Sequence, residues 1–214
     1  MPTALAAVAL EVFASVLAPP RCASCDAPVR RLAVFCAACA ATVEAACGAE
    51  AGDTAAFVYG GAVARAITRL KYESRPDLAR PLGDLLWRAL APRASSLEGA
   101  LVVPVPLHAA RLAERGYNQS SLLSRRVARH LRARFVPLAL ARDRDTPKQA
   151  TLDRAARLAN VSGAFRVREP GRVRGHVVCL VDDVCTTGAT LEACRQALRS
   201  AGAEAVTTAV LARA

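Results

Sequence analysis

The stretch of sequence that decides the fold is residues 177–190, which read VVCLVDDVCTTGAT. Its first five residues, 177–181, are all apolar, and such a run is typical of a strand buried on both faces of a parallel sheet. A helical pattern follows at 189–201 and ends at Gly202, and residues 205–211 form a further apolar strand pattern. Strand, loop, helix and strand in this order predict the crossover unit of a parallel sheet.

The loop between this strand and helix combines acidic and hydroxyl side chains. Two adjacent carboxylates follow the apolar run, where they can accept hydrogen bonds from the vicinal hydroxyls of a ribose, with or without Mg²⁺. Backbone N–H groups at a helix N-terminus bind phosphate, and neighbouring hydroxyls add donors. The alternative is that a Thr or Asp only caps the helix and that the acids mark an ordinary strand end. The predicted ribose-phosphate cradle consists of Asp182, Asp183, Thr186, Thr187, Gly188, Ala189 and Thr190.

The chain upstream adds the alternating strands and helices of an α/β domain. Residues 45–54, rich in Ala and Gly, indicate a linker. We therefore expect a first unit at 1–50 and a second domain at 55–214, a length that holds one α/β domain behind a short appendage. The expected elements are a strand at 57–59, helices at 63–72 and 78–90, a strand at 101–105 and a helix at 118–134.

Composition and charge fit an α/β protein that meets anionic ligands. Hydrophobic residues make up 53% of the 214 and aromatic residues only 4%, which fits a core of Ala, Val and Leu. The net charge of +11 attracts phosphorylated or nucleic-acid partners, but it comes mostly from Arg and indicates a compositional bias more than a binding stripe. No stretch is long and apolar enough to span a bilayer. Residues 1–20 fit a secretory signal poorly, because no basic residue precedes the apolar run and Glu11 interrupts it; a short amphipathic helix is the better interpretation, and we expect a cytoplasmic protein.

Four of the eight cysteines form two C-x-x-C pairs with ten residues between the pairs. Two such pairs converge on a tetrahedral Zn²⁺ held by four thiolates, which leaves no open coordination position and predicts a structural metal. A redox C-x-x-C or an iron–sulfur site is the alternative, but neither explains two equal pairs so close together. The predicted zinc ligands are Cys22, Cys25, Cys36 and Cys39.

The other four cysteines lie outside this pattern. Cys47 has no evident role, and Cys179 and Cys194 fall on apolar faces, where they are expected to be small buried residues. Cys185 lies near a helix N-terminus, a position that lowers the pKa of a thiol. No His accompanies it in the sequence, so we prefer a filler role to that of a nucleophile.

The loop at 182–190 is similar to the signature with which type I phosphoribosyltransferases hold 5-phosphoribosyl 1-pyrophosphate. Neither a Walker loop nor a dinucleotide glycine motif occurs in the sequence. Further motifs stand in the order seen in the ComF family, competence protein F-like proteins that join a double zinc ribbon to a type I phosphoribosyltransferase domain. With the cysteine pairs, the resemblance covers essentially the whole chain. These motifs are FVYG at 57–60, LKY at 70–72, VPVPL at 103–107, RGYNQ at 115–119, QATL at 149–152 and the run from Arg157 through Asn160 to Phe165.

The resemblance implies an α/β protein of the type I phosphoribosyltransferase fold, with a central, mostly parallel sheet behind a small N-terminal zinc-ribbon module. In such enzymes pyrophosphate leaves the ribose through a cation-like state, so orientation and charge neutralisation, normally with Mg²⁺, carry catalysis. Lys71 and Arg115 are the candidate pyrophosphate contacts, with 115–119 as a mobile flap, although both residues could equally be surface charges.

One departure from the superfamily concerns acid–base chemistry. Purine-salvage members carry an acidic residue in the phosphate loop, and by register that position is Thr186 here. His108 could act as an acid or base, but a lone His at a helix start is more often only polar and exposed. The base-activating group is therefore not identified.

Two functions are compatible with these features, and the sequence leaves both open. In the first, which the resemblance implies, the chain binds 5-phosphoribosyl 1-pyrophosphate or a related ribose phosphate and serves natural transformation. Its further partners would then be incoming single-stranded DNA and a DNA-uptake helicase. In the second, it is an active phosphoribosyltransferase of nucleotide salvage or metabolism, unrelated to DNA uptake. The residues identify no acceptor and do not decide whether catalysis occurs.

Overall fold

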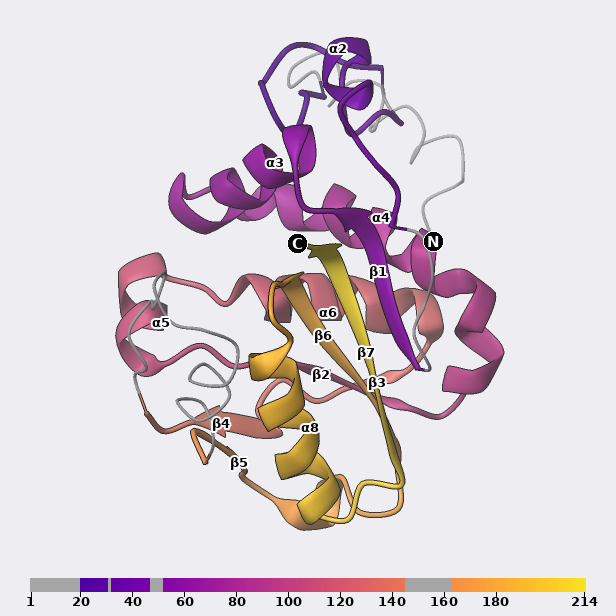
Figure 1. Cartoon of the computed structure of the whole chain (residues 1–214), viewed down its shortest axis with the longest axis vertical. Helices are drawn as coiled ribbons and strands as arrows, with labels where there is room; N and C mark the ends of the chain where they lie inside the picture. The colour runs from indigo at the N-terminus through magenta and orange to yellow at the C-terminus, as the bar shows by residue number, and fades with distance from the viewer. Residues whose placement is uncertain (1–19, 31, 47–51, 145–162) are drawn as a thin grey trace, which may run out of the picture.

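A parallel sheet forms the centre of the molecule. The structure is a computed structural model that describes residues 20–30, 32–46, 52–144 and 163–214. In these ranges five strands lie in the order β1-β7-β6-β2-β3, and every neighbouring pair is parallel (Figure 1). The predicted α/β fold with a central parallel sheet is confirmed. The strands are β1 (Asp53–Val58), β2 (Leu101–Pro104), β3 (Arg134–Phe135), β6 (Val177–Cys185) and β7 (Ala205–Arg213).

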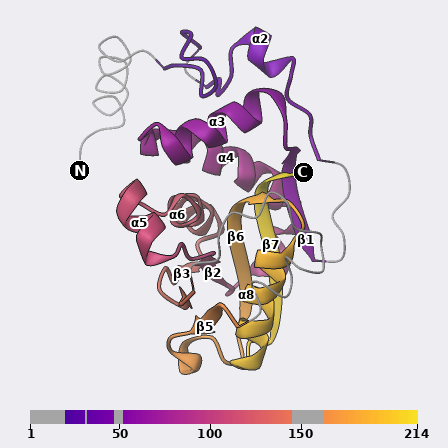
Figure 2. The same cartoon turned by 60° about the vertical axis from the view of Figure 1, so that its left-hand side comes forward.

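Helices cover both faces of this sheet (Figures 1 and 2). On one face lie α3 (Gly61–Tyr72), α4 (Ala79–Leu90) and α6 (Gln119–Leu131), and on the other lies α8 (Ala189–Ser200). A two-stranded antiparallel sheet of β4 (Leu140–Arg142) and β5 (Phe165–Val167) packs beside α8. The smaller elements are α2 (Ala37–Ala40), α5 (Ala109–Arg115) and 3-10 helices at Pro76–Leu78, Ala91–Leu97 and Pro170–Arg172.

Strand β6 is buried on both faces, and its side chains alternate between two cores. Cys179 and Val181 pack with α3, α4 and α6, whereas Val178 and Leu180 pack with α8. This alternation is the period of two that a strand imposes on its side chains. The same alternation orients the acidic residues, because Asp183 continues the series of Cys179 and Val181 toward α3 and α6.

Two element boundaries differ from the prediction in ways that affect the site. Strand β6 continues to Cys185, because its pairing with β7 extends to Cys185 opposite Arg213, so both carboxylates lie inside the strand and not beyond its end. The helix predicted at 118–134 ends at Leu131. Arg132 then adopts the left-handed conformation, and β3 begins at Arg134.

Other differences concern the start of β1 and the short elements. Strand β1 begins at Asp53, inside the predicted linker, and Ala45 pairs with Phe57 in an isolated bridge. Strands β3, β4 and β5 and helix α5 are too short for a periodic pattern to indicate them. Four predicted features lie outside the described residues: the amphipathic helix apart from Pro20, Cys47, the QATL motif, and the run from Arg157 up to residue 162.

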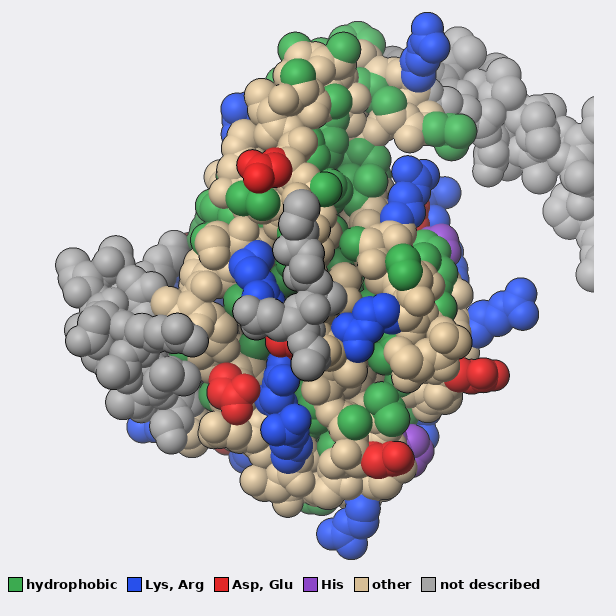
Figure 3. All heavy atoms as spheres, turned by 45° about the vertical axis from the view of Figure 1, so that its right-hand side comes forward, with side chains coloured by type: hydrophobic (Ala, Val, Ile, Leu, Met, Phe, Trp, Pro, Cys, Tyr) green, Lys and Arg blue, Asp and Glu red, His purple; other side chains and the backbone are tan. Residues whose placement is uncertain are grey.

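The surface charge is distributed. Figure 3 shows Lys and Arg side chains spread over the described part of one face, with Asp and Glu among them, and no single stripe of one sign there. In the described ranges, no helix has the length and apolar character needed to cross a membrane.

Helices α4 and α6 meet closely at Gly83, and this contact can be tested. A Cβ atom at position 83 would lie 2.7 Å from the Cβ atom of Arg126, closer than packed side chains allow. Gly83→Ala should therefore lower the free energy of unfolding by about 1–3 kcal/mol, although Ala is the better helix former. Urea denaturation measures the change. The control is Gly171→Ala, where an added Cβ meets nothing within 4 Å, and equal midpoints for the two variants would contradict the close packing.

Candidate ligand site and metal centre

Two buried carboxylates lie near the carboxyl end of β6. Asp182 is 8% exposed and Asp183 is 2% exposed. Parallel strands end at the same edge of a sheet, and here this edge meets the N-terminus of α6 and the C-terminus of α3. Open α/β sheets bind ligands at this edge, so the carboxylates occupy a position where a ligand is expected.

Asp183 is paired with a lysine from α3. The Nζ atom of Lys71 lies 2.5 Å from Oδ2 of Asp183, and Nε2 of Gln119, the first residue of α6, donates to Oδ1 at 3.3 Å. Each carboxylate oxygen therefore has a partner from a different helix. The structure thus brings the candidate residue Lys71 to the acidic pair and adds Gln119, which the sequence indicated only as part of a flap.

Asp182 is held by hydroxyl and backbone donors. Oγ of Ser120 donates to its Oδ1 at 2.6 Å, and the backbone N–H of Asp183 donates to the same oxygen at 2.9 Å. Ser120 is in place because Asn118 caps α6. The Oδ1 atom of Asn118 accepts from the N–H of Ser120 at 3.0 Å, and its Nδ2 donates to the carbonyl of Val105 at 3.0 Å. The start of α6 is therefore fixed against the end of β2, and sequence reasoning missed Ser120.

Burial and charge repulsion determine the ionisation of this pair. Burial, with the neighbouring Asp183 charge, raises the pKa of Asp182 to about 7. Burial acts against the Lys71 cation, but the charges of Asp183 and Asp182 outweigh it and raise the pKa of Lys71. Lys71 thus stays protonated at neutral pH, whereas Asp182 gains or loses its proton there. A ligand hydroxyl that donates to Asp182 favours the ionised form.

The loop after β6 enters α8 through a left-handed glycine. Gly188 has a φ of +78° at the N-cap of α8, a conformation that a Cβ atom disfavours. Oγ1 of Thr187 accepts from the N–H of Ala189 at 3.5 Å. The predicted cradle therefore divides: Asp182 borders the pocket at this loop, while Asp183 faces Lys71. The pocket is lined by Asp182, Val184, Cys185, Thr186, Thr187, Gly188, Ala189, Thr190 and Leu191.

A second pocket lies between the ends of α3 and α5. The guanidinium of Arg115 lies over the ring of Tyr72, 5.2 Å from its centroid, and donates to Oε1 of Gln119. Because Lys71 both borders this pocket and contacts Asp183, the pocket adjoins the carboxylate pair. It is lined by Lys71, Tyr72, Ser74, Glu114 and Arg115.

The structure also places three other features that the sequence singled out. His108 caps α5, and its ring Nδ1 accepts from the N–H of Ala110 at 3.4 Å. Cys185 is a buried residue of β6 whose thiol pKa is raised by burial, which agrees with a filler role. Residues 115–119 run from the last residue of α5 to the buried first residue of α6, and their role as a mobile flap stays a prediction.

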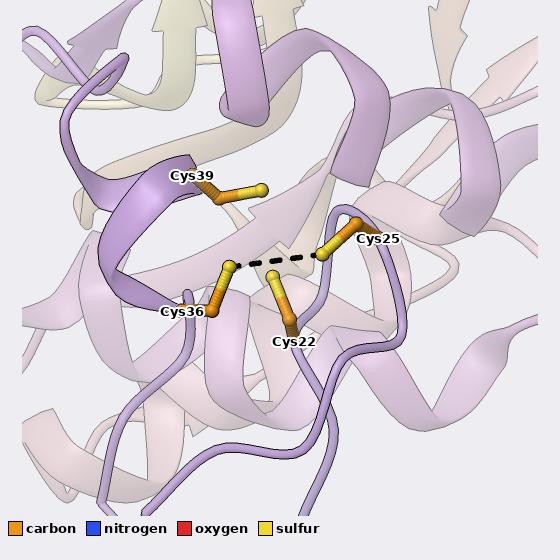
Figure 4. A group of neighbouring side chains, drawn as sticks. All are labelled: Cys22, Cys25, Cys36 and Cys39. Carbon is orange, nitrogen blue, oxygen red and sulfur yellow. Dashed lines mark hydrogen bonds between the residues drawn. The ribbon is translucent and has the colours of Figure 1, made fainter.

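Four cysteines from the N-terminal segment point toward one centre (Figure 4). Their Sγ atoms all lie within 4.8 Å of one another, and those of Cys25 and Cys36 are 3.7 Å apart. A tetrahedral Zn²⁺ with Zn–S bonds of about 2.3 Å separates its ligands by about 3.8 Å, so the cluster has the size of a four-thiolate site. The predicted set of Cys22, Cys25, Cys36 and Cys39 is thus confirmed as a group that can hold a metal.

The C-terminal part of the chain matches a known domain. Residues 118–214 match the phosphoribosyl transferase domain. Among solved structures, the glutamine phosphoribosylpyrophosphate amidotransferase of B. subtilis aligns with a TM-score of 0.45 and 23% identity, over 66% of this chain and 30% of that chain. The observed fold and the domain match define an α/β protein of the phosphoribosyltransferase-fold class.

Two curated relatives identify the family within this class. The DNA utilization protein YhgH of Escherichia coli strain K12 is 37% identical over 150 residues, which are 69% of this chain and 65% of the relative. Competence protein F of Haemophilus influenzae is 35% identical over 152 residues, 69% of this chain and 66% of the relative. The chain therefore spans about 65% of the length of the curated relatives it matches. It belongs to the ComF family, as its motifs predicted.

The pKa of Asp182 predicts how stability depends on pH. The folded-state value of about 7 lies above the ordinary 3.8, so the folded chain holds an extra proton between about pH 4 and about pH 7. The free energy of unfolding should fall as the pH rises through this window. The Asn side chain in Asp182→Asn does not ionise, so this pH-dependent loss of stability disappears, while its amide oxygen still accepts from Ser120. At pH 8 the variant should therefore be about 1–4 kcal/mol more stable than the wild type.

Thermal denaturation at pH 5 and pH 8 checks this expectation. The gain should appear at pH 8 and shrink at pH 5, where the wild-type carboxyl is protonated. Glu169→Gln, at an exposed ion pair with Arg172, is the control and should change little. A variant no more stable than the wild type at pH 8 would contradict the raised pKa.

The geometry of the cysteine cluster predicts metal binding. The purified chain should carry about one metal ion, and Cys36→Ser should lose it because three thiolates no longer complete the tetrahedron. Mass spectrometry of metal content measures the loss. Cys185→Ala, a matched thiol removal outside the cluster, should keep the ion, and full metal content in the Cys36→Ser variant would refute the site.

Proposed function

We propose that this chain binds 5-phosphoribosyl 1-pyrophosphate or a related ribose phosphate at the carboxyl end of β6. The observation that carries the proposal is the pair of buried carboxylates, Asp182 and Asp183, immediately before a loop of hydroxyls that enters α8 through Gly188. Burying two carboxylates costs free energy unless donors from the protein or a ligand satisfy them. The N–H groups and hydroxyls of the adjacent loop can donate to a phosphate.

Each part of the site has a role in this proposal. The first N–H groups of α8 and the hydroxyls of Thr186, Thr187 and Thr190 hold the 5-phosphate. Asp182 and Asp183 accept hydrogen bonds from the ribose hydroxyls. Lys71 and Arg115, which border the second pocket, contact the pyrophosphate. Mg²⁺, when bound with the donor, would neutralise part of the pyrophosphate charge.

We further propose a role in DNA uptake. The motivation is that the relatives include a competence protein and a DNA utilization protein. The chain would act in the cytoplasm in natural transformation, with single-stranded DNA and a DNA-uptake helicase as partners. In this arrangement residues 1–50 form a module that a structural Zn²⁺ holds together, and residues 55–214 form the ligand-binding domain.

A second candidate function is catalysis of phosphoribosyl transfer for nucleotide metabolism. The neighbouring Lys71 and Arg115 favour it, because they can stabilise a leaving pyrophosphate. Thr186 weighs against it, because the loop then offers no carboxylate at the position where purine-salvage enzymes activate the base. Binding without turnover is therefore the better-supported proposal.

Calorimetry with 5-phosphoribosyl 1-pyrophosphate and Mg²⁺ tests the binding. The double variant Asp182→Asn, Asp183→Asn should weaken affinity by about 100-fold or more, because the ribose hydroxyls would donate to neutral amide oxygens in place of charged carboxylates. Glu169→Gln, which removes an acidic charge in an exposed ion pair, is the control and should bind as the wild type does. Equal affinity for the double variant would remove these carboxylates from the site.

Two further measurements separate the functions. Release of pyrophosphate from the donor in the presence of a panel of bases identifies an enzyme, and its absence in a chain that binds the donor identifies a binding protein. A band shift with single-stranded DNA that weakens as salt rises supports direct DNA contact. No shift at low salt would argue against that contact.

A further inference from the structure

Helix α3 lies between the cysteine cluster and the carboxylate pair. Residues 69 and 71 are two positions apart, and at about 100° per residue their side chains leave the helix on nearly opposite sides. Lys71 extends to Asp183 on β6. Arg69 extends the other way, to the segment that carries the first two cysteines, so one turn of helix joins the two sites.

Arg69 is buried, and most of the atoms that accept its hydrogen bonds belong to that segment. It is 8% exposed, and its Nη1 donates to the carbonyl oxygens of Cys22 at 3.4 Å and Ala23 at 3.2 Å. Its Nη2 donates to Oδ2 of Asp26, and its Nε donates to Glu73 at 3.0 Å. The guanidinium therefore binds the backbone of the first C-x-x-C pair directly, and Asp26 follows that pair by one residue.

Other contacts hold the same side of α3 against the cysteine segment. Nε of Arg65, one helical turn before Arg69, donates to Oγ of Ser24 at 2.8 Å, and its Nη2 donates to Sγ of Cys39 at 3.8 Å. At the start of the helix, Oγ1 of Thr42 accepts from the N–H of Ala62 at 3.0 Å. The cysteine segment thus fixes α3 at its beginning, middle and end.

The opposite side of α3 belongs to the ligand site. Lys71 contacts Asp183, and the carbonyl of Leu70 accepts a hydrogen bond from the hydroxyl of Tyr117 at 2.5 Å. Tyr117 lies in the connection that leads to Asn118 and the start of α6. The last turn of α3 is therefore shared by the cysteine segment on one side and by the residues around the carboxylates on the other.

We propose that Arg69 is a positioning residue through which the metal-bound cysteine segment holds Lys71 on Asp183, so that metal loading sets affinity at the carboxylate pair. When the four thiolates hold a metal, the carbonyls of Cys22 and Ala23 are fixed, and Arg69 fixes the last turn of α3 against them. Loss of the metal frees these acceptors and lets Lys71 leave Asp183. The part of the inference that concerns ligand affinity rests on the proposed function, whereas the position of Lys71 does not.

Chemical labelling of lysine tests the position of Lys71 without any ligand. The chain has two lysines, Lys71 and Lys148, so acetylation followed by mass spectrometry reports each amine separately, and Lys148 is the reference in the same sample. Lys71 should react slowly in the metal-loaded wild type, because its side chain is 20% exposed and ion-paired. In Arg69→Met, and in the wild type after metal removal by a chelator, its labelling relative to Lys148 should rise about tenfold.

The controls separate positioning from general loss of structure. Arg172→Met, which removes an exposed Arg–Glu pair from the 3-10 helix at Pro170–Arg172, should leave Lys71 protected. Should Arg69→Met not fold, Asp26→Asn removes the carboxylate that pairs Arg69 with the cysteine segment, at a position with a φ of +61°, which Asn tolerates. Unchanged labelling of Lys71 in a folded, metal-loaded variant of either kind would overturn the inference.

A double-mutant cycle tests the consequence for affinity. With 5-phosphoribosyl 1-pyrophosphate and Mg²⁺, Arg69→Met and Lys71→Met should each weaken binding about tenfold, and the double variant should be little weaker than Lys71→Met alone. Fully additive effects would show that Arg69 does not act through Lys71. A wild type that does not bind the donor would defeat the proposed function, while the labelling result would still decide the role of Arg69.

Discussion

The contact between Lys71 and Asp183 is the interaction around which the candidate ligand site is arranged. It joins α3 to β6 with an ammonium and a carboxylate whose side chains are 20% and 3% exposed. Removing two charges from water costs more than their attraction returns unless further donors complete the geometry, and Gln119 supplies one. A buried pair of this kind contributes little net stability, so its value lies in holding charges where a ligand can use them.

The neighbouring elements are arranged around this contact. Asn118 caps α6 and ties it to the end of β2, so that Gln119 and Ser120 reach the two carboxylates. Burial raises the pKa of Asp182, so the ionised form of this carboxyl is less favourable here than in water. A ribose that donates hydrogen bonds, and a pyrophosphate that accepts from Lys71, would relieve that state. In the proposed function, a bound ligand would therefore offset part of the cost of burying the carboxylates.

The sequence predicted the parts of this arrangement that depend on local pattern. Local sequence patterns were enough to predict three features: the apolar run of β6, the two C-x-x-C pairs and the loop that enters α8. Lys71 was a candidate because of a motif, but its partner could not be predicted, because the contact joins residues far apart in the chain. Ser120 and Arg69 were missed for the same reason: a polar side chain on a helix shows its partner only when the helix is packed.

Because α3 contacts the cysteine segment through Arg69 and the carboxylates through Lys71, the two sites share a rigid helix. The most direct test of the central claim, that the end of β6 is a ribose-phosphate site, is a crystal structure of the metal-loaded chain with 5-phosphoribosyl 1-pyrophosphate. We expect the 5-phosphate on the loop from Thr186 to Thr190 and the ribose hydroxyls on Asp182 and Asp183. We also expect Lys71 to keep its contact with Asp183 and to donate a second N–H to the pyrophosphate. A donor bound elsewhere, with the loop from Thr186 to Thr190 empty, would contradict the proposed site.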